Sequence, residues 1–215
     1  HPDRWLKDVN VWEIRKDNEA VEIPFYGYID MSTENGHLVI KHRNAEMVKA
    51  VPYDVPIIGD GNHIVNTLRL WSAEPASVYP DNAFEYHRNL REISSMLYPN
   101  DETDEGKILR LKQQYFFVSA GVKSAVRRHK EMFKDCHNLH EKICFHINDT
   151  HPALIIPELM RILVDEEGIE WDEAWNITKN TCAYTNHTIL AEALEKWPVH
   201  LFKMLLPRIF SITEE

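Results

Sequence analysis

Two junctions of the same kind constrain the fold of this chain more than any other feature of its 215-residue sequence. In each junction, a short apolar run ends in a cluster of polar residues, and apolar residues at helical spacing follow at once. The first junction occupies residues 142–163 and the second occupies residues 183–197. A buried strand that leads through a polar turn into an amphipathic helix is typical of layered α/β domains, so the fold class is predicted to be α/β.

The first part of the chain, residues 1–80, is predicted to be strand-rich. β-Branched or alternating runs, interrupted by a turn signal at residues 32–36, predict strands at residues 21–29, 37–41, 49–59 and 63–74. Pro52 and Pro56 fall inside the third of these strands. Because proline cannot donate to a sheet ladder, that strand is expected to lie at an edge or to be irregular.

The second part, residues 81–215, is predicted to be a helix-rich α/β region. Residues 142–147 form its expected strand, while Pro152 and Gly168 mark the start and the end of the helix after it. Apolar spacings of three and four predict helices at residues 84–97, 105–133, 152–168, 172–181, 188–196 and 199–211.

Composition excludes several classes of function. The formal net charge is −10, and nucleic-acid binders usually present a basic face, so no nucleic-acid partner is expected. No apolar run approaches the roughly 18 residues of a membrane span, and no signal peptide is apparent. Three cysteines are too few for a disulfide framework, which favours a cytoplasmic setting. The chain starts at His1 and stops at Glu215 within a helical pattern, so we expect a piece of a longer protein.

The polar clusters of the two junctions are candidate binding sites. Asp149 and His151 in the first could hydrogen-bond a polyhydroxylated ligand, because a carboxylate accepts and an imidazole can donate or accept. The alternative is that Asp149 or Thr150 only caps the helix that follows. In the second cluster His187 precedes Thr188, and the alternative there is a structural histidine.

A third candidate is the polar loop between the first two predicted helices. Tyr98 could stack on a sugar, with Asn100 and Asp101 contacting its hydroxyls and Arg110 on the next helix. The alternative is an acidic helix start that complements the helix dipole. No metal site is predicted, because Cys136 and Cys144 lack zinc-ligand spacing. The sequence also contains no Gly-rich phosphate loop and no G-x-S-x-G elbow.

Ordered blocks over nearly the whole chain resemble the α-glucan phosphorylase family, which comprises the glycogen, starch and maltodextrin phosphorylases. The blocks are NTLRLWSAE (66–74), LYPND (97–101), EGKILRLKQQYF (105–116), INDTHPALIIPELMRIL (147–163), AYTNHTILAEALEKWPV (183–199) and LLPR (205–208). Because members of this family are much longer, the resemblance implies an internal fragment of the N-terminal domain. That domain is one Rossmann-like half of a GT-B glycosyltransferase architecture.

The resemblance implies an activity and partners. The family transfers the terminal α-1,4-linked glucosyl unit of a glucan to inorganic phosphate, giving glucose 1-phosphate. Its pyridoxal phosphate is held by a lysine in the C-terminal half, which lies outside this chain. Residues 84–97 resemble the helix through which family members form homodimers. Arg127 and Arg128 resemble arginines near an allosteric phosphate site, and a solvated helix turn is the alternative for them.

Site roles also follow from the resemblance. His187 resembles the histidine at the cleavage point, where its carbonyl would face a developing oxocarbenium-like charge, and Thr188 adjoins it. Asn100 and Asp101 resemble residues of the loop that gates the active site. The groups that resemble the acceptor side of the oligosaccharide channel are Tyr98, Arg110, Asp149 and His151.

The sequence departs from the family at two positions. Glu102 stands where many members carry an amide, which puts the sugar contacts of the gating loop in doubt. Ile108 replaces a glutamate and is expected to change only the helix surface. The main hypothesis is therefore a phosphorylase fragment that is inactive alone. The alternatives are a non-catalytic carbohydrate-binding module and a scaffold domain.

Overall fold

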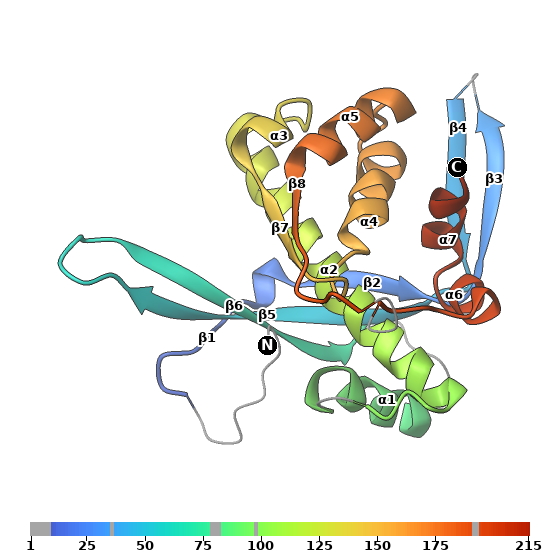
Figure 1. The fold of residues 1–215 in the computed structure, drawn as a ribbon, viewed down its shortest axis with the longest axis horizontal. Helices are drawn as coiled ribbons and strands as arrows, with labels where there is room; N and C mark the ends of the chain where they lie inside the picture. Colours follow the sequence, from blue (N-terminus) through green and yellow to red (C-terminus); the bar gives the residue numbers. More distant parts are fainter. Residues whose placement is uncertain (1–9, 35–36, 78–82, 97–98, 191–193) are drawn as a thin grey trace. The chain divides into compact units, whose positions relative to one another are not determined.

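The structure, a computed structural model, describes residues 10–34, 37–77, 83–96, 99–190 and 194–215. The chain separates into two compact units, each built from two stretches of sequence (Figure 1). Unit 1 contains His1–Pro24 and Glu46–Ala120, and unit 2 contains Phe25–Ala45 and Gly121–Glu215. Strands and helices are mixed, which confirms the predicted α/β class at that level.

Unit 1 is built on an antiparallel sheet. Its strands are β1 (Ile14–Arg15), β2 (Val21–Phe25), β5 (Glu46–Ile58) and β6 (Val65–Pro75), with a 3-10 turn η1 (Asp17–Glu19) between the first two. The order is β1-β5-β2, and the full length of β6 pairs with β5, from Val48 opposite Pro75 to Ile58 opposite Val65. Figure 1 shows β5 and β6 as one long ribbon. Val51, Tyr53 and Leu70 form a buried cluster on this sheet.

The two prolines of β5 do not confine it to an edge, so that expectation is wrong. The carbonyl of Pro52 accepts a hydrogen bond of 2.9 Å from the amide of Lys16 just after β1. The N and C=O of a strand residue point to the same side, so the nitrogen of Pro52 faces β1 and not β6. Pro56, four residues later, has the same orientation. Because β1 is only two residues long, the missing N–H groups cost β5 little pairing.

Two helices complete the described part of unit 1. Helix α1 (Ala83–Ser95) packs on β6, with Tyr86, Leu90 and Ile93 buried. Helix α2 (Asp104–Phe133) runs across the boundary between the units and buries Leu111, Tyr115 and Phe116. Both helices were predicted from apolar spacing that matches the helical repeat, and both are confirmed over the described residues.

Unit 2 begins with a hairpin of β3 (Tyr28–Glu34) and β4 (His37–Arg43). The single strand predicted at residues 21–29 is therefore wrong: it breaks at Tyr26 and Gly27, which have φ values of 58° and 73°. At Gly27 a Cβ would lie 2.2 Å from the carbonyl oxygen of Arg43, so only glycine fits. Near this turn the amide of Tyr26 donates to the carbonyl of Leu205 at 2.7 Å.

Unit 2 also contains a parallel pair, β7 (Phe145–Asn148) and β8 (Cys182–Thr185). The pair is not the buried strand layer that the sequence predicted, because only Ile147 of these residues is buried. The short helix α3 (Leu139–Lys142) precedes β7. The connection between the strands contains α4 (Ile155–Arg161), a π-helical turn η2 (Ile162–Glu166) and α5 (Trp171–Thr181). Gly168, with φ of 67°, ends the first of these helical segments as predicted, but the helix begins at Ile155 rather than at Pro152. Residues 151–154 form turns instead.

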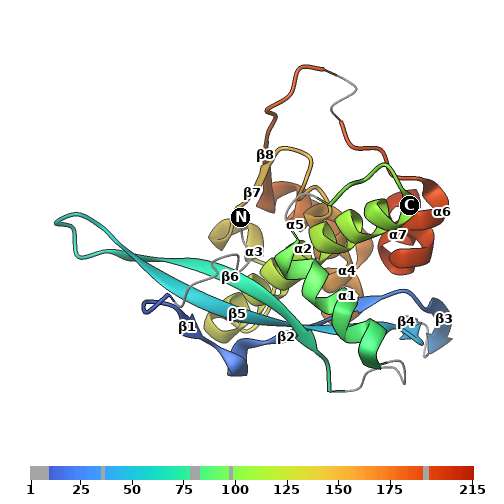
Figure 2. The same cartoon turned by 90° about the horizontal axis from the view of Figure 1, so that it is seen from below.

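The helix predicted at residues 188–196 is wrong for the described residues, since residues 186–190 and 194–198 are irregular (Figure 2). The side chain of Asn186 bonds to both the amide and the carbonyl of Thr188, which competes with helical hydrogen bonding. Ile189 and Leu190 are 100% and 56% exposed, so a helix here has no packed apolar face to support it.

The helix predicted at residues 199–211 is two helices, α6 (Val199–Leu205) and α7 (Pro207–Glu214). Leu206, at φ −132° and ψ 63°, leaves the helical region because the ring of Pro207 restricts the residue before it. Helix α7 packs against α4 and is fixed by Arg208, which bonds both oxygens of Asp165 at 2.8 and 2.9 Å. The side chains of this ion pair are only 5% and 10% exposed.

Candidate functional site

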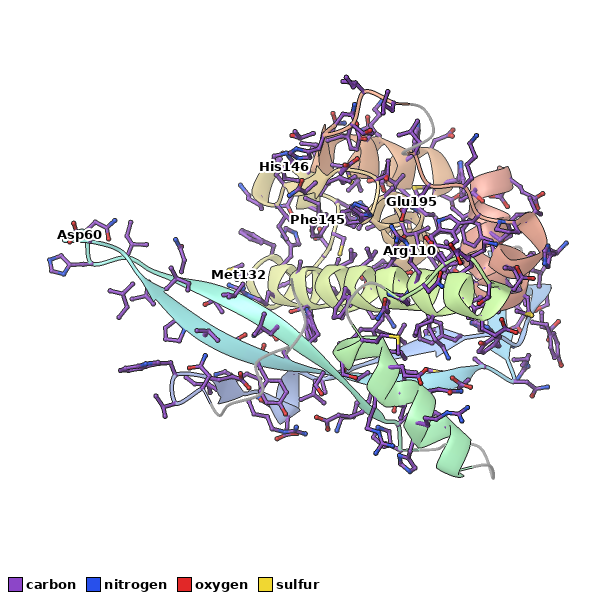
Figure 3. The ribbon with its side chains drawn as sticks, turned by 60° about the horizontal axis from the view of Figure 1, so that its bottom comes forward. Asp60, Arg110, Met132, Phe145, His146 and Glu195 are labelled. Atoms are coloured by element: carbon purple, nitrogen blue, oxygen red, sulfur yellow. The ribbon has the colours of Figure 1, made fainter. Side chains whose placement is uncertain are left out.

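The ends of β7 and β8 bring the two polar clusters together. Because the strands are parallel, both clusters leave the same edge of the pair, with Asn148 opposite Thr185. The amide of Asp149 then donates to the carbonyl of Thr185 at 2.9 Å, which extends the pairing by one residue. His146, which Figure 3 labels on β7, also shares a side-chain hydrogen bond with Thr185 on β8. The clusters that hold Asp149 and His187 therefore start side by side.

Asp149 has an unusual backbone. Its φ of 63° lies in the left-handed region, where aspartate is one of the few tolerated residues. Its Oδ1 accepts from the amide of Thr150 at 2.9 Å. Helix α4 begins at Ile155 with Leu154 as its N-cap and no side-chain cap bond, so the capping alternative for Asp149 and Thr150 is wrong. The cluster is a strand-end turn.

His151 lies in the turns that follow. Its side chain is 58% exposed, and its Nδ1 is 3.5 Å from Oε1 of Glu195, whose own side chain is 13% exposed. Figure 3 labels Glu195, which the sequence did not single out. At this distance the carboxylate of Glu195 lies beside the imidazole of His151, whose mostly exposed ring can donate or accept hydrogen bonds. The arrangement suits hydrogen bonding to a neutral, hydroxyl-rich ligand.

His187 and Thr188 follow β8 in the irregular segment. His187 is exposed, and Thr188 is half-buried. Asn186 stabilises this segment, because its Oδ1 accepts hydrogen bonds from the hydroxyl of Tyr184 and from the amide of Thr188, each at 3.3 Å. The candidate side chains that follow β7 and β8 therefore lie in irregular segments stabilised by local hydrogen bonds, and not in a helix.

The loop residues predicted from the sequence belong to unit 1. Tyr98 lies outside the described residues. Oδ1 of Asn100 accepts from the amide of Glu102 at 3.0 Å. Asp101 pairs with Arg110 on α2, with 3.4 Å between Oδ2 of Asp101 and Nη1 of Arg110. Figure 3 labels Arg110. Unit 1 thus brings together Asn100, Asp101 and Arg110, which are three of its four candidates.

The described residues contain neither a metal-binding cluster nor a membrane-spanning helix. Among them, no three His, Cys, Asp or Glu side chains are grouped so that they could hold a metal ion. Burial raises the pKa of Cys136 and of Cys182 to about 11, so both thiols stay protonated at neutral pH. No helix in the described ranges is long and apolar enough to span a membrane.

Comparison with known proteins gives one consistent result. A sequence model of the family described as carbohydrate phosphorylase matches residues 1–215. The chain is 56% identical over 215 residues to a glycogen phosphorylase of Bacillus subtilis (strain 168), covering 100% of the chain and 27% of that relative. It is 45% identical over 227 residues to the brain form of Bos taurus glycogen phosphorylase, covering 98% of the chain and 26% of the relative.

The muscle form of Homo sapiens glycogen phosphorylase is 44% identical over 230 residues, covering 99% of the chain and 27% of the relative. The chain thus spans about a quarter of the length of the curated relatives it matches.

Proposed function

Because this chain belongs to the carbohydrate phosphorylase family, we propose that it forms one part of an α-1,4-glucan phosphorylase. The reaction is transfer of the terminal α-1,4-linked glucosyl unit to inorganic phosphate, with glucose 1-phosphate as product. The observation that carries this proposal is the match along the entire chain, at 44–56% identity, to proteins named glycogen phosphorylase.

His187 is assigned to the cleavage point. It is exposed, and because residues 186–190 are not helical, its carbonyl is not taken up by a helical hydrogen bond. A carbonyl dipole that faces the sugar would stabilise positive charge as it develops on the ring. Thr188, whose amide is held by Asn186, fixes the backbone on the other side of the histidine.

The remaining residues are assigned to glucan binding. Asp149 and His151 would hydrogen-bond sugars on the acceptor side, supported by the position of Asp149 beside the end of β8 and by the exposed side chain of His151. Arg110 belongs to the same group through the family resemblance, as does Tyr98, which offers a stacking face. Asn100 and Asp101 would contact the sugar from a gating loop. Glu102 weakens that last assignment, because it places a carboxylate where many relatives have an amide.

The assembly is proposed on the same basis. The chain would be part of the N-terminal Rossmann-like domain of a GT-B enzyme, cytoplasmic, and dimeric through α1. Pyridoxal phosphate supplies a phosphate group for the reaction when bound. In the family its imine-forming lysine lies outside the region that this chain matches. We therefore assign no residue of this chain to the cofactor.

The test uses the complete enzyme that contains this chain, supplied with maltodextrin and phosphate. Wild-type protein should release glucose 1-phosphate, and His187→Ala should lower kcat by at least 100-fold if a transition-state interaction is lost. His137→Ala is the matched control, because His137 is exposed and pairs with Glu173 on α5. Equal rates for the two variants would remove the assignment of His187.

The 215-residue chain alone should give no turnover, even with added pyridoxal phosphate. It should also bind maltoheptaose weakly in calorimetry, because half of a cleft offers few of the contacts. Micromolar binding by the chain, together with an inactive complete protein, would instead support a carbohydrate-binding module.

A further inference from the structure

The start of α2 approaches the loop before it more closely than a side chain would allow. A Cβ built on Gly106 would lie 1.6 Å from the carbonyl oxygen of Asn100 and 2.7 Å from its carbonyl carbon. It would also lie 3.3 Å from the Cα of Asp101. Real Cβ atoms essentially never come within 3.0 Å of another heavy atom. The obstacle is backbone, so it cannot be relieved by a side-chain rotation.

Space, rather than backbone freedom, explains the glycine. Gly106 is helical, and among the described residues the glycines with positive φ are Gly27, Gly61 and Gly168. Alanine has a higher helix propensity than glycine, so glycine in the first turn of α2 is not favoured unless the packing requires it. The carbonyl of Asn100 is the requirement.

Hydrogen bonds also join the end of this loop to the first turn of α2. The hydroxyl of Thr103 accepts from the amide of Gly106 at 3.2 Å, and its carbonyl accepts from Lys107 at 3.0 Å. Asn100 bonds the amide of Glu102, and Asp101 reaches Arg110 one turn beyond Gly106. Loop and helix start therefore form one packed element with a fixed spacing.

We propose that Gly106 is a positioning residue: it sets the place of the loop that carries Asn100 and Asp101. This inference rests on the proposed function, in which those two residues contact the sugar. Gly106 itself touches no substrate. It acts because the loop can lie against α2 only where no Cβ stands.

Gly106→Ala in the complete enzyme should displace the loop. To reach an ordinary contact, the Asn100 carbonyl must move by more than an ångström. A misplacement of about 1 Å at a binding group typically costs on the order of 100-fold, so kcat/KM for the glucan should fall by about 10- to 100-fold. Gly121→Ala is the matched control in the same helix, since a Cβ there meets nothing within 4 Å. It should leave kcat/KM within about twofold.

A double-mutant cycle separates loop displacement from a general structural effect. If Gly106→Ala acts through the loop, much of its effect is already lost in Asp101→Ala. Adding Gly106→Ala to that background should then lower kcat/KM by less than about threefold. The proposal would be overturned if the fold-losses in kcat/KM of the two single variants simply multiplied in the double variant. It would also be overturned if Gly106→Ala had the same kcat/KM as Gly121→Ala.

Hydrogen exchange tests the placement without any assay of catalysis. The amide of Glu102, which is bonded to Asn100, should exchange at least tenfold faster in Gly106→Ala than in wild type or Gly121→Ala. If the wild-type enzyme shows no phosphorolysis, the proposed function fails, while this measurement still decides whether Gly106 places the loop. Unchanged exchange would overturn the proposal.

A second variant covers the case in which Gly106→Ala does not fold. Thr103→Ala adds no atoms and removes the hydroxyl that accepts from Gly106. It should speed exchange at Glu102 in the same direction and lower kcat/KM by a smaller factor. No change in either quantity would show that the loop does not depend on its packing against the start of α2.

Discussion

Replacing Tyr86 with phenylalanine should destabilise unit 1 by about 2 to 3 kcal/mol without changing its packing. The hydroxyl of this buried residue on α1 donates to the carbonyl of Met47 at 2.7 Å and accepts from the amide of Ala76 at 3.1 Å. It therefore ties the helix to the start of β5 and to the chain just after β6. Phenylalanine fills the same volume, so no cavity term is added.

The magnitude follows from what each partner loses. Ala76 is 4% exposed, and a buried N–H without an acceptor costs about 1–3 kcal/mol. Met47 is half-buried, so water can reach its carbonyl and the net loss is about 0.5–1 kcal/mol, and the middle values of the two losses together give about 2 to 3 kcal/mol. For a chain of this size, 1 kcal/mol corresponds to roughly 2–4 °C in Tm, so about 4–12 °C is expected.

Urea unfolding followed by fluorescence measures the loss, and hydrogen exchange at the Ala76 amide locates it. Tyr28→Phe is the control, because Tyr28 is 55% exposed and its substitution should change stability by less than about 0.5 kcal/mol. The reasoning is refuted if Tyr86→Phe unfolds at the same urea concentration as Tyr28→Phe. It is equally refuted if exchange at Ala76 stays as slow as in the wild-type chain.

Three further outcomes are expected. Burial and the nearby Arg161 lower the pKa of His42, so the unfolded chain binds this proton more tightly than the folded one. The stability that folding gains from keeping His42 neutral is therefore fully present above pH 6.5. It is lost as the pH falls through the lower pKa of His42 in the folded chain. The stability difference between wild type and His42→Gln should shrink between pH 7.5 and 5.5 in urea titrations, and a constant difference would contradict this. Iodoacetamide at pH 8 should label the exposed Cys144 well before Cys182. Because the pKa of Cys182 is about 11, its labelling rate should rise about tenfold per pH unit. Mass spectrometry of the labelled chain measures both, and labelling of Cys182 first would contradict the prediction. Arg208→Met removes the bidentate partner of Asp165 and should cost about 3–5 kcal/mol, so an unchanged urea midpoint would contradict it.

Periodicity predicted most elements of this fold, and its failures have local causes. Long patterns such as α2 are recognisable because many apolar positions agree. The break at Tyr26 and Gly27 was missed because a turn in the left-handed region leaves the flanking strand patterns intact. The helix predicted at residues 188–196 failed because periodicity does not register side chains that bond their own backbone, as Asn186 does.

The candidate site was predictable in part. The sequence predicted that Asp149 and His187 each follow a strand end, but their pairing at one edge is shown only by the parallel register of β7 and β8. Glu195 could not be predicted, since it reaches His151 from an irregular segment for which the sequence indicated a helix. Gly106 was also missed, because a close approach to the Asn100 carbonyl is a property of three-dimensional packing that one glycine in a helical pattern does not reveal.

The parallel pairing of β7 with β8 also has a consequence for the order of folding. Phe145 pairs with Cys182, and the segment between them contains the whole of α4 and α5. A hairpin such as β3 with β4 closes a short loop, whereas this pair must close a long one, and the entropy of closure slows its formation. The turns that carry Asp149 and His187 should therefore become ordered late, after the helices that bring their strands together.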